Sequence, residues 1–175
     1  MEPSVLQTAT EVIEFRSFSN LWFWIVLAAL WSTTSHWVLG VPFDMVRRAA
    51  GGSAEALRDM HLLANVQARR LLYIAEATGV VTTASAFFLL TMLTLLAVVY
   101  EVEFAQAILA LFLPMLIVAV LSVRAARRVE GLDPVDLGNL LARHRRNIQL
   151  VGVLAIFSTS MFGMWVNLNH SALGT

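Results

Sequence analysis

The amino-acid sequence predicts an all-α integral membrane protein with four transmembrane helices, both chain ends outside the cell's cytoplasm, and amphipathic cytoplasmic helical extensions. Two observations carry this prediction. Of the 175 residues, 58% are hydrophobic and the mean hydropathy is +0.73, whereas soluble domains are about 45–50% apolar. The apolar residues also gather in four long runs separated by arginine-bearing stretches, a pattern typical of membrane spans.

The four runs form a single membrane domain, residues 1–175. The predicted spans cover about residues 20–39, 79–99, 104–123 and 147–168. About 20 helical residues cross a hydrocarbon core of roughly 30 Å, so each run is long enough. We expect Ser19 to cap the first span, Gly40 and Pro42 to end it, and Pro114 to kink the third.

The arginines predict the orientation of the spans. All but Arg16 fall into two segments, residues 40–78 and 124–146, which lie on the same side of the membrane if the four spans are correct. The positive-inside rule places both segments in the cytoplasm, which makes this a multi-pass bacterial inner-membrane protein with both termini periplasmic. The mildly amphipathic stretch of residues 3–18 is expected to lie along the outer interface.

The first arginine-bearing segment has the pattern of an amphipathic helix from Ala54 to Gly79. Its predicted apolar face consists of Leu57, Met60, Ala64, Leu71 and Ile74. Its predicted polar face consists of Glu55, Arg58, Asn65, Arg69 and Glu76. Gly79 is the one residue that could break this helix before the second span, and without a break a single helix runs from Ala54 to about Val99.

The second segment predicts a shorter amphipathic helix that leads into the fourth span. Asp133 is the expected cap and Pro134 suits the first helical position. The apolar face is Leu137, Leu140, Leu141 and His144, and the third span is expected to continue through residues 124–130. These cytoplasmic helices either pack on each other and on lipid headgroups or dock a cytosolic partner, for which the candidate residues are Arg58, Arg69, Arg143 and Arg146.

The residues that could carry chemistry are few. The chain has no cysteine, which excludes thiolate catalysis and cysteine ligation of zinc or iron–sulfur clusters. Its formal net charge of zero does not indicate a nucleic-acid partner. The candidate cofactor-binding residues are His36, His144 and His61 at the cytoplasmic side, and a haem or metal held there is the alternative hypothesis of a redox subunit. We expect no catalytic residue, no metal and no cofactor.

A third hypothesis is a small transporter or channel lined by hydroxyl groups. Ser32 to Ser35, Thr78 to Ser85 and Ser158 to Ser160 form three such clusters. Against this, no Asp, Glu, Arg or Lys falls inside a predicted span, whereas ion-coupled transporters carry such residues in mid-membrane. Ala155, Thr159 and Gly163 form a series of small residues that favours close helix packing within the bundle or between copies, so homo-oligomerisation stays open.

The chain resembles a small alphaproteobacterial membrane-protein family labelled "component of SufBCD complex". The resemblance rests on "EVIEFRSFSNLWFWIVLAALWSTTSHWVLGVPFDMV" (11–46), "RRLLYIAEATG" (69–79), "VEFAQA" (102–107) and "LARHR" (141–145). It implies an association with cytosolic iron–sulfur cluster assembly, as an anchor and not as a scaffold. The sequence therefore predicts a non-enzymatic accessory protein, in contact with the bilayer, that binds a cytoplasmic protein or a membrane complex through its cytoplasmic helices.

Overall fold

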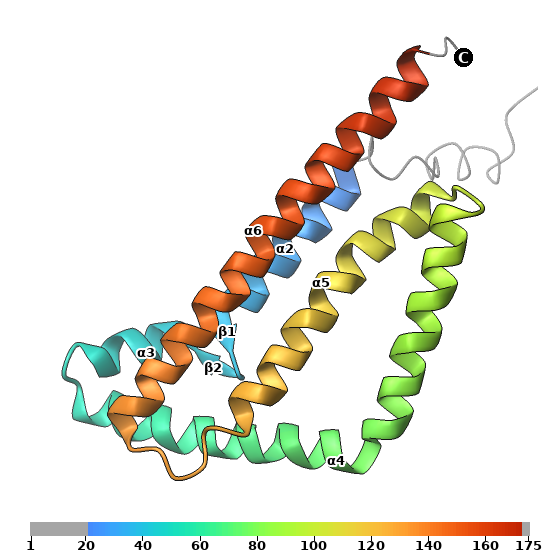
Figure 1. Cartoon of the computed structure of the whole chain (residues 1–175). Helices are drawn as coiled ribbons and strands as arrows, with labels where there is room; N and C mark the ends of the chain where they lie inside the picture. The colour runs from blue at the N-terminus through green and yellow to red at the C-terminus, as the bar shows by residue number, and fades with distance from the viewer. Residues whose placement is uncertain (1–20, 173–175) are drawn as a thin grey trace, which may run out of the picture.

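The computed structural model describes residues 21–172, with side chains at 21–166 and 168. The elements are α2 (Leu21–His36), β1 (Trp37–Val38), β2 (Val41–Pro42), α3 (Phe43–Ala50), α4 (Ala54–Val98), α5 (Glu103–Ala126) and α6 (Pro134–Ala172) (Figure 1). The expectations for residues 3–18 and for the cap at Ser19 lie outside the described residues.

Three helices of the described chain are long and apolar enough to cross a membrane: α4, α5 and the part of α6 up to Val166. This confirms the predicted helical class and supports a protein associated with the membrane. The remaining apolar helix, α2, has 16 residues in the described part and lies beside α6 (Figure 1). The link between α4 and α5 is as short as predicted, and Pro114 lies inside α5.

The predicted end of the first span at Leu39 is wrong, because α2 already ends at His36. The chain then makes a two-residue antiparallel hairpin in which Val38 pairs with Val41. Both turn residues are left-handed, with φ of 52° at Leu39 and 74° at Gly40, as a type I′ turn requires. Burial of Val38, Leu39 and Val41 in a hydrophobic core shared with α3, α4, α5 and α6 stabilises the hairpin.

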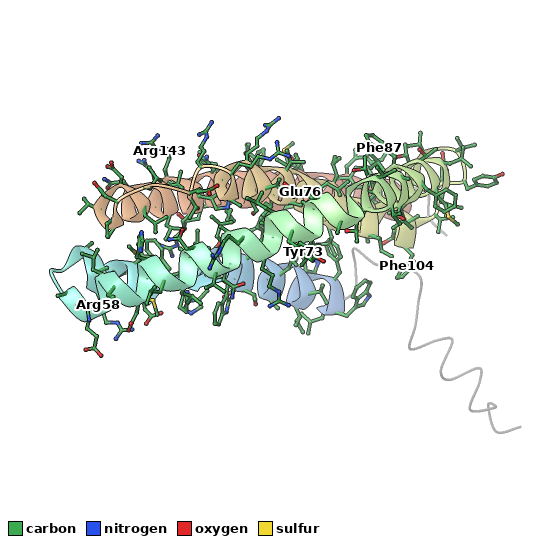
Figure 2. The ribbon with its side chains drawn as sticks, turned by 90° about the horizontal axis from the view of Figure 1, so that it is seen from below. Arg58, Tyr73, Glu76, Phe87, Phe104 and Arg143 are labelled. Atoms are coloured by element: carbon green, nitrogen blue, oxygen red, sulfur yellow. The ribbon has the colours of Figure 1, made fainter. Side chains whose placement is uncertain are left out.

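The sequence left open whether the helix breaks at Gly79, and the structure shows that it does not: α4 is one helix from Ala54 to Val98. It bends sharply instead. Figure 2 shows α4 running across the view past Tyr73 and Glu76 and nearly end-on at Phe87. Between Glu76 and Phe87, the Thr78 hydroxyl donates to the Ile74 carbonyl at 2.8 Å, a back-bond that favours bending.

The bend makes the first half of α4 run across the ends of the other helices (Figure 1). There it forms what we call the flanking layer, made of the hairpin, α3, residues 54–78 of α4, the end of α5 and the start of α6. One hydrophobic core fills this layer, and a second core joins α2, α5 and α6 above it. The flanking helices thus pack on one another, as one of the two sequence-based interpretations expected.

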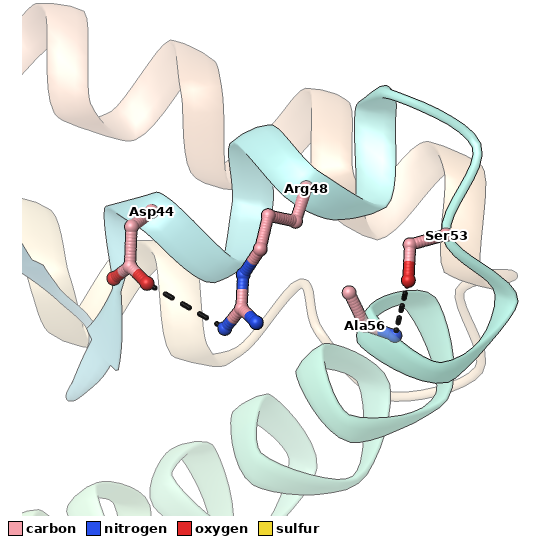
Figure 3. Close-up of polar contacts among 4 residues, drawn as sticks. All are labelled: Asp44, Arg48, Ser53 and Ala56. Atoms are coloured by element: carbon pink, nitrogen blue, oxygen red, sulfur yellow. Dashed lines mark hydrogen bonds and ion pairs between the residues drawn. The ribbon is translucent and has the colours of Figure 1, made fainter.

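Local capping fixes the ends of the layer's helices. Figure 3 shows the Ser53 hydroxyl accepting from the Ala56 N–H at 3.2 Å and the Arg48–Asp44 ion pair at 3.5 Å along α3. Asp133 caps α6 as predicted, accepting from the N–H groups of the second and third residues that follow it, at 2.9 and 2.8 Å.

The third helix does not continue through residue 130. Helix α5 ends at Ala126, and residues 127–131 form turns. Two facts explain the early end: Val129 is buried in the layer's core, and Gly131 takes a left-handed φ of 78° that reverses the chain towards the Asp133 cap.

Candidate functional site

The first half of α4 has a buried face that joins it to the flanking layer. Its fully buried residues recur every fourth position: Ala56, Met60, Ala64 and Ala68. Three of the four are alanines, which lets α4 approach the ends of α5 and α6 closely. Leu137 and Leu141 of α6 are buried in the same core. The predicted apolar face is therefore only partly correct, since Ile74 is 47% exposed.

The opposite face of this half-helix carries exposed apolar side chains between arginines. We call it the α4 stripe: Arg58, Leu62, Val66, Arg69 and Tyr73, which share one helical face by their spacing. Leu62 is 59% exposed, Val66 52% and Tyr73 72%. Because the buried face packs on the ends of α5 and α6, the stripe faces away from their apolar segments.

Among the described residues, no ion pair neutralises the arginines of the α4 stripe. In the part of the chain that the structure describes, the one ion pair is Arg48–Asp44 on α3. Exposed carboxylates lie beside the stripe, at Glu55 and Asp59 near its start and at Glu76 near its end. An apolar centre with a charged rim that includes Arg and Tyr is the composition of protein–protein interfaces.

The four arginines predicted to bind a partner belong to two separate surfaces. Arg58 and Arg143 lie on opposite sides of the flanking layer (Figure 2). Arg69 belongs to the α4 stripe, whereas Arg143 and Arg146 line a groove of about 430 Å³ beside the turn between α5 and α6. All four side chains are exposed.

Arg145 has a structural role that the sequence did not indicate. Its Nε donates to the Ser35 carbonyl at 3.1 Å, and its guanidinium group lies 3.9 Å from the centre of the Phe43 ring. Ser35 is in the last turn of α2, where backbone carbonyls lack helical partners. Arg145 therefore ties α6 to the end of α2 and to the start of α3.

The three candidate histidines each contact a different partner. His144 is 3% exposed, and its Nε2 lies 3.2 Å from the Ser122 hydroxyl. His61 Nε2 lies 3.3 Å from the Leu132 carbonyl oxygen, and His36 is exposed with its ring against Trp37. Burial lowers the pKa of His144, which lies outside the apolar segment of α6. No group of three or more His, Asp or Glu side chains in the described residues could hold a metal ion.

The hydroxyl groups of the spans bond mainly to their own helices. Thr34, Thr91 and Thr94 each donate to the carbonyl four residues earlier. Thr159 and Ser158 line an open apolar groove of about 1170 Å³ between α5 and α6. Only 6% of the most apolar stretch of α4 is buried in the protein, so this half of the helix presents its surface outward.

Comparison of the chain with family models, with curated proteins and with solved structures gives no match. Leu62, Val66 and Tyr73 were not identified from the sequence as parts of the α4 stripe. Their spacing from Arg58 and Arg69 was the available signal, since all five positions fall on one side of the helix.

Proposed function

We propose that this chain is a non-enzymatic membrane accessory protein that docks a protein partner on the α4 stripe. The observation that carries the proposal is the pair of opposite faces on α4. The alanine-rich face is buried in the core, while Leu62 and Val66 stay exposed between Arg58 and Arg69. A partner with an apolar patch flanked by charged groups would bury them.

The proposal includes four spans in a bacterial inner membrane, the first of which is the span predicted at about residues 20–39, represented in the structure by α2. Both termini are then periplasmic and the flanking layer is cytoplasmic. The arginine distribution supports this orientation, because eleven of the twelve arginines lie in the two segments of that layer. The stripe faces away from the apolar segments, so it meets the cytosol and not the bilayer.

The partner that the family resemblance suggests is the cytosolic iron–sulfur cluster assembly machinery. This chain would serve as its membrane anchor, since a protein without cysteine cannot hold a cluster through thiolates. The stripe is compatible with that role because it offers a docking surface and no ligand set.

A pull-down from native membranes in mild detergent tests the proposal. We expect a discrete partner with the wild type. In Leu62→Ser/Val66→Ser, its recovery should fall more than tenfold, because each buried aliphatic side chain contributes about 1.5–3 kcal/mol. Arg58→Glu/Arg69→Glu should act in the same direction. Arg143→Glu/Arg146→Glu makes the same charge change on the other side of the layer and is the matched control.

Two results would contradict the docking proposal. One is the absence of any stoichiometric partner with the wild type. The other is equal loss of the partner in the stripe variants and in the Arg143/Arg146 control, which would mean that overall charge, and not the stripe, governs recovery. Orientation has its own test: cysteines placed at the exposed residues Val99 and Glu130 of this cysteine-free chain should react with a membrane-impermeant thiol reagent from opposite sides.

A further inference from the structure

Three arginines, one from the turn after α5 and two from α6, line one groove at the edge of the flanking layer. Arg128 follows the end of α5, and Arg143 and Arg146 lie on α6. The groove has a volume of about 430 Å³, within the range of roughly 300–1,000 Å³ that small-molecule sites occupy. Its other lining residues are Leu132, Asp136, Asn139, Leu140 and Ala142.

Helical spacing explains why only some residues of the Arg-His-Arg-Arg run face the groove. Arg143 and Arg146 are three residues apart and share a face. Between them, His144 is buried beside Ser122 and Arg145 reaches the Ser35 carbonyl in the opposite direction. The buried His144 and the hydrogen-bonded Arg145 fix the rotation of α6, and with it the side from which Arg143 and Arg146 project.

The charge of the groove favours an anion. Three guanidinium groups and the Asp136 carboxylate leave two positive charges. None of these arginines forms an ion pair with a carboxylate in the described part of the chain. A planar guanidinium group can donate two parallel hydrogen bonds to two oxygens of one phosphate. The leucines of the groove can make apolar contacts with carbon atoms next to that phosphate.

With the spans placed as proposed above, the groove lies at the level of the lipid headgroups. Arg146 immediately precedes Asn147, where the apolar run of α6 starts. Arg143 lies about one turn before Arg146, farther from that run. Arg128 comes shortly after the apolar run of α5 ends. All three arginines therefore border the apolar segments, unlike the α4 stripe, which faces away from them.

We propose that Arg128, Arg143 and Arg146 bind a phosphate group, supplied in the bilayer by the headgroup of an anionic phospholipid. Arg143 and Arg146 contact the phosphate oxygens from one side and Arg128 from the other. Leu132 and Leu140 contact the glycerol part. This site is independent of the α4 stripe and does not rest on the docking proposal.

Native mass spectrometry of the detergent-purified protein, titrated with phosphatidylglycerol or with phosphatidylcholine of the same acyl chains, tests the site. We expect preferential binding of one phosphatidylglycerol. In Arg143→Gln/Arg146→Gln its affinity should fall about 30-fold, from the usual contribution of each arginine near an anionic headgroup. Arg58→Gln/Arg69→Gln removes the same charge from the other side and should change the affinity less than about threefold.

Further experiments distinguish a lipid phosphate from a soluble one, and guanidinium geometry from positive charge alone. Arg143→Lys/Arg146→Lys keeps the charge without the planar fork and should retain intermediate affinity. Displacement of the lipid by glycerol 1-phosphate or by inorganic phosphate would also support a phosphate site, with a soluble source. Equal binding of the two lipids, or equal loss in the two glutamine variants, would overturn the proposal. Melting temperatures of all variants in detergent confirm that each one is folded.

Discussion

Replacement of Gly152 by alanine tests the packing of α2 on α6. A Cβ at Gly152 would lie 2.8 Å from Cε3 of Trp31, 3.1 Å from Cδ2 and 3.3 Å from Cζ3. Ordinary carbon–carbon contacts are about 3.5–4.0 Å, so the indole ring would have to move by roughly 0.7 Å or more. Trp31 is buried in the core that joins α2, α5 and α6, so its ring has little room to move.

The destabilisation caused by Gly152→Ala can be measured against a control, Gly138→Ala, in the same helix. A Cβ at Gly138 would lie 3.7 Å from the Met60 Cε, an ordinary contact. Both substitutions gain the same helix propensity, about 1 kcal/mol, so the difference between them isolates the overpacking at Trp31. Overpacking costs about 1–3 kcal/mol. Since each kcal/mol shifts the melting temperature of a chain of this size by about 2–4 °C, Gly152→Ala should melt about 2–12 °C below Gly138→Ala.

Thermal unfolding in detergent, followed by circular dichroism, measures this difference. Trp31→Phe provides the rescue, because phenylalanine lacks the second ring that the new Cβ would meet. That exchange also removes the Trp31 Nε1–H, which is buried and has no hydrogen-bond partner among the described residues. The gap between the two alanine variants should close in the Trp31→Phe background. Equal melting temperatures in the wild-type background, or a gap that Trp31→Phe leaves unchanged, would refute the reasoning.

Three further perturbations follow from the contacts of α6. Arg145→Gln should lower the free energy of unfolding by about 2–4 kcal/mol, because it loses the charged hydrogen bond to Ser35 and the contact with the Phe43 ring. Arg146→Gln should change the same free energy by no more than about 0.5 kcal/mol. Denaturant titration of the two variants measures the difference. Because burial lowers the pKa of His144 from 6.5, the unfolded chain binds a proton more readily, so stability should fall as the pH decreases below about 6.5. A melting-temperature series between about pH 7.5 and 5 should show this slope, and His144→Gln should flatten it. Asp133→Ala should cost about 0.5–2 kcal/mol, seen as earlier melting, by loss of the α6 cap.

The parts of this fold that the sequence predicted correctly depend on local signals. The start of α6 is one case: Asp133 supplies the cap, Pro134 the first helical position, and Leu137 and Leu141 the buried face. Each of these signals acts within a few residues, so neighbouring sequence was sufficient. The continuity of α4 through Gly79 was left open by the sequence, and one glycine costs a helix only about 1 kcal/mol, too little to break it.

The parts that were missed depend on tertiary contacts. Leu39 adopts a left-handed φ that leucine rarely takes, and only the burial of the hairpin compensates for it. On α4, apolar residues occur on more than one side, so periodicity does not decide which side is buried. The row of Ala56, Ala64 and Ala68 faces the core because small side chains allow close approach, which leaves Leu62 and Val66 outside.

Site-specific photo-crosslinking in native membranes tests docking on the α4 stripe most directly. The absence of native cysteine allows a thiol-linked photoprobe to be placed at Leu62, Val66 or Tyr73 one at a time. Val135, exposed at the start of α6, is the matched control position. The account predicts one adduct of the same partner mass from all three stripe positions and none from Val135. An adduct with a second 19.3 kDa copy of the chain, the same adducts from Val135, or no adduct at any stripe position would contradict it.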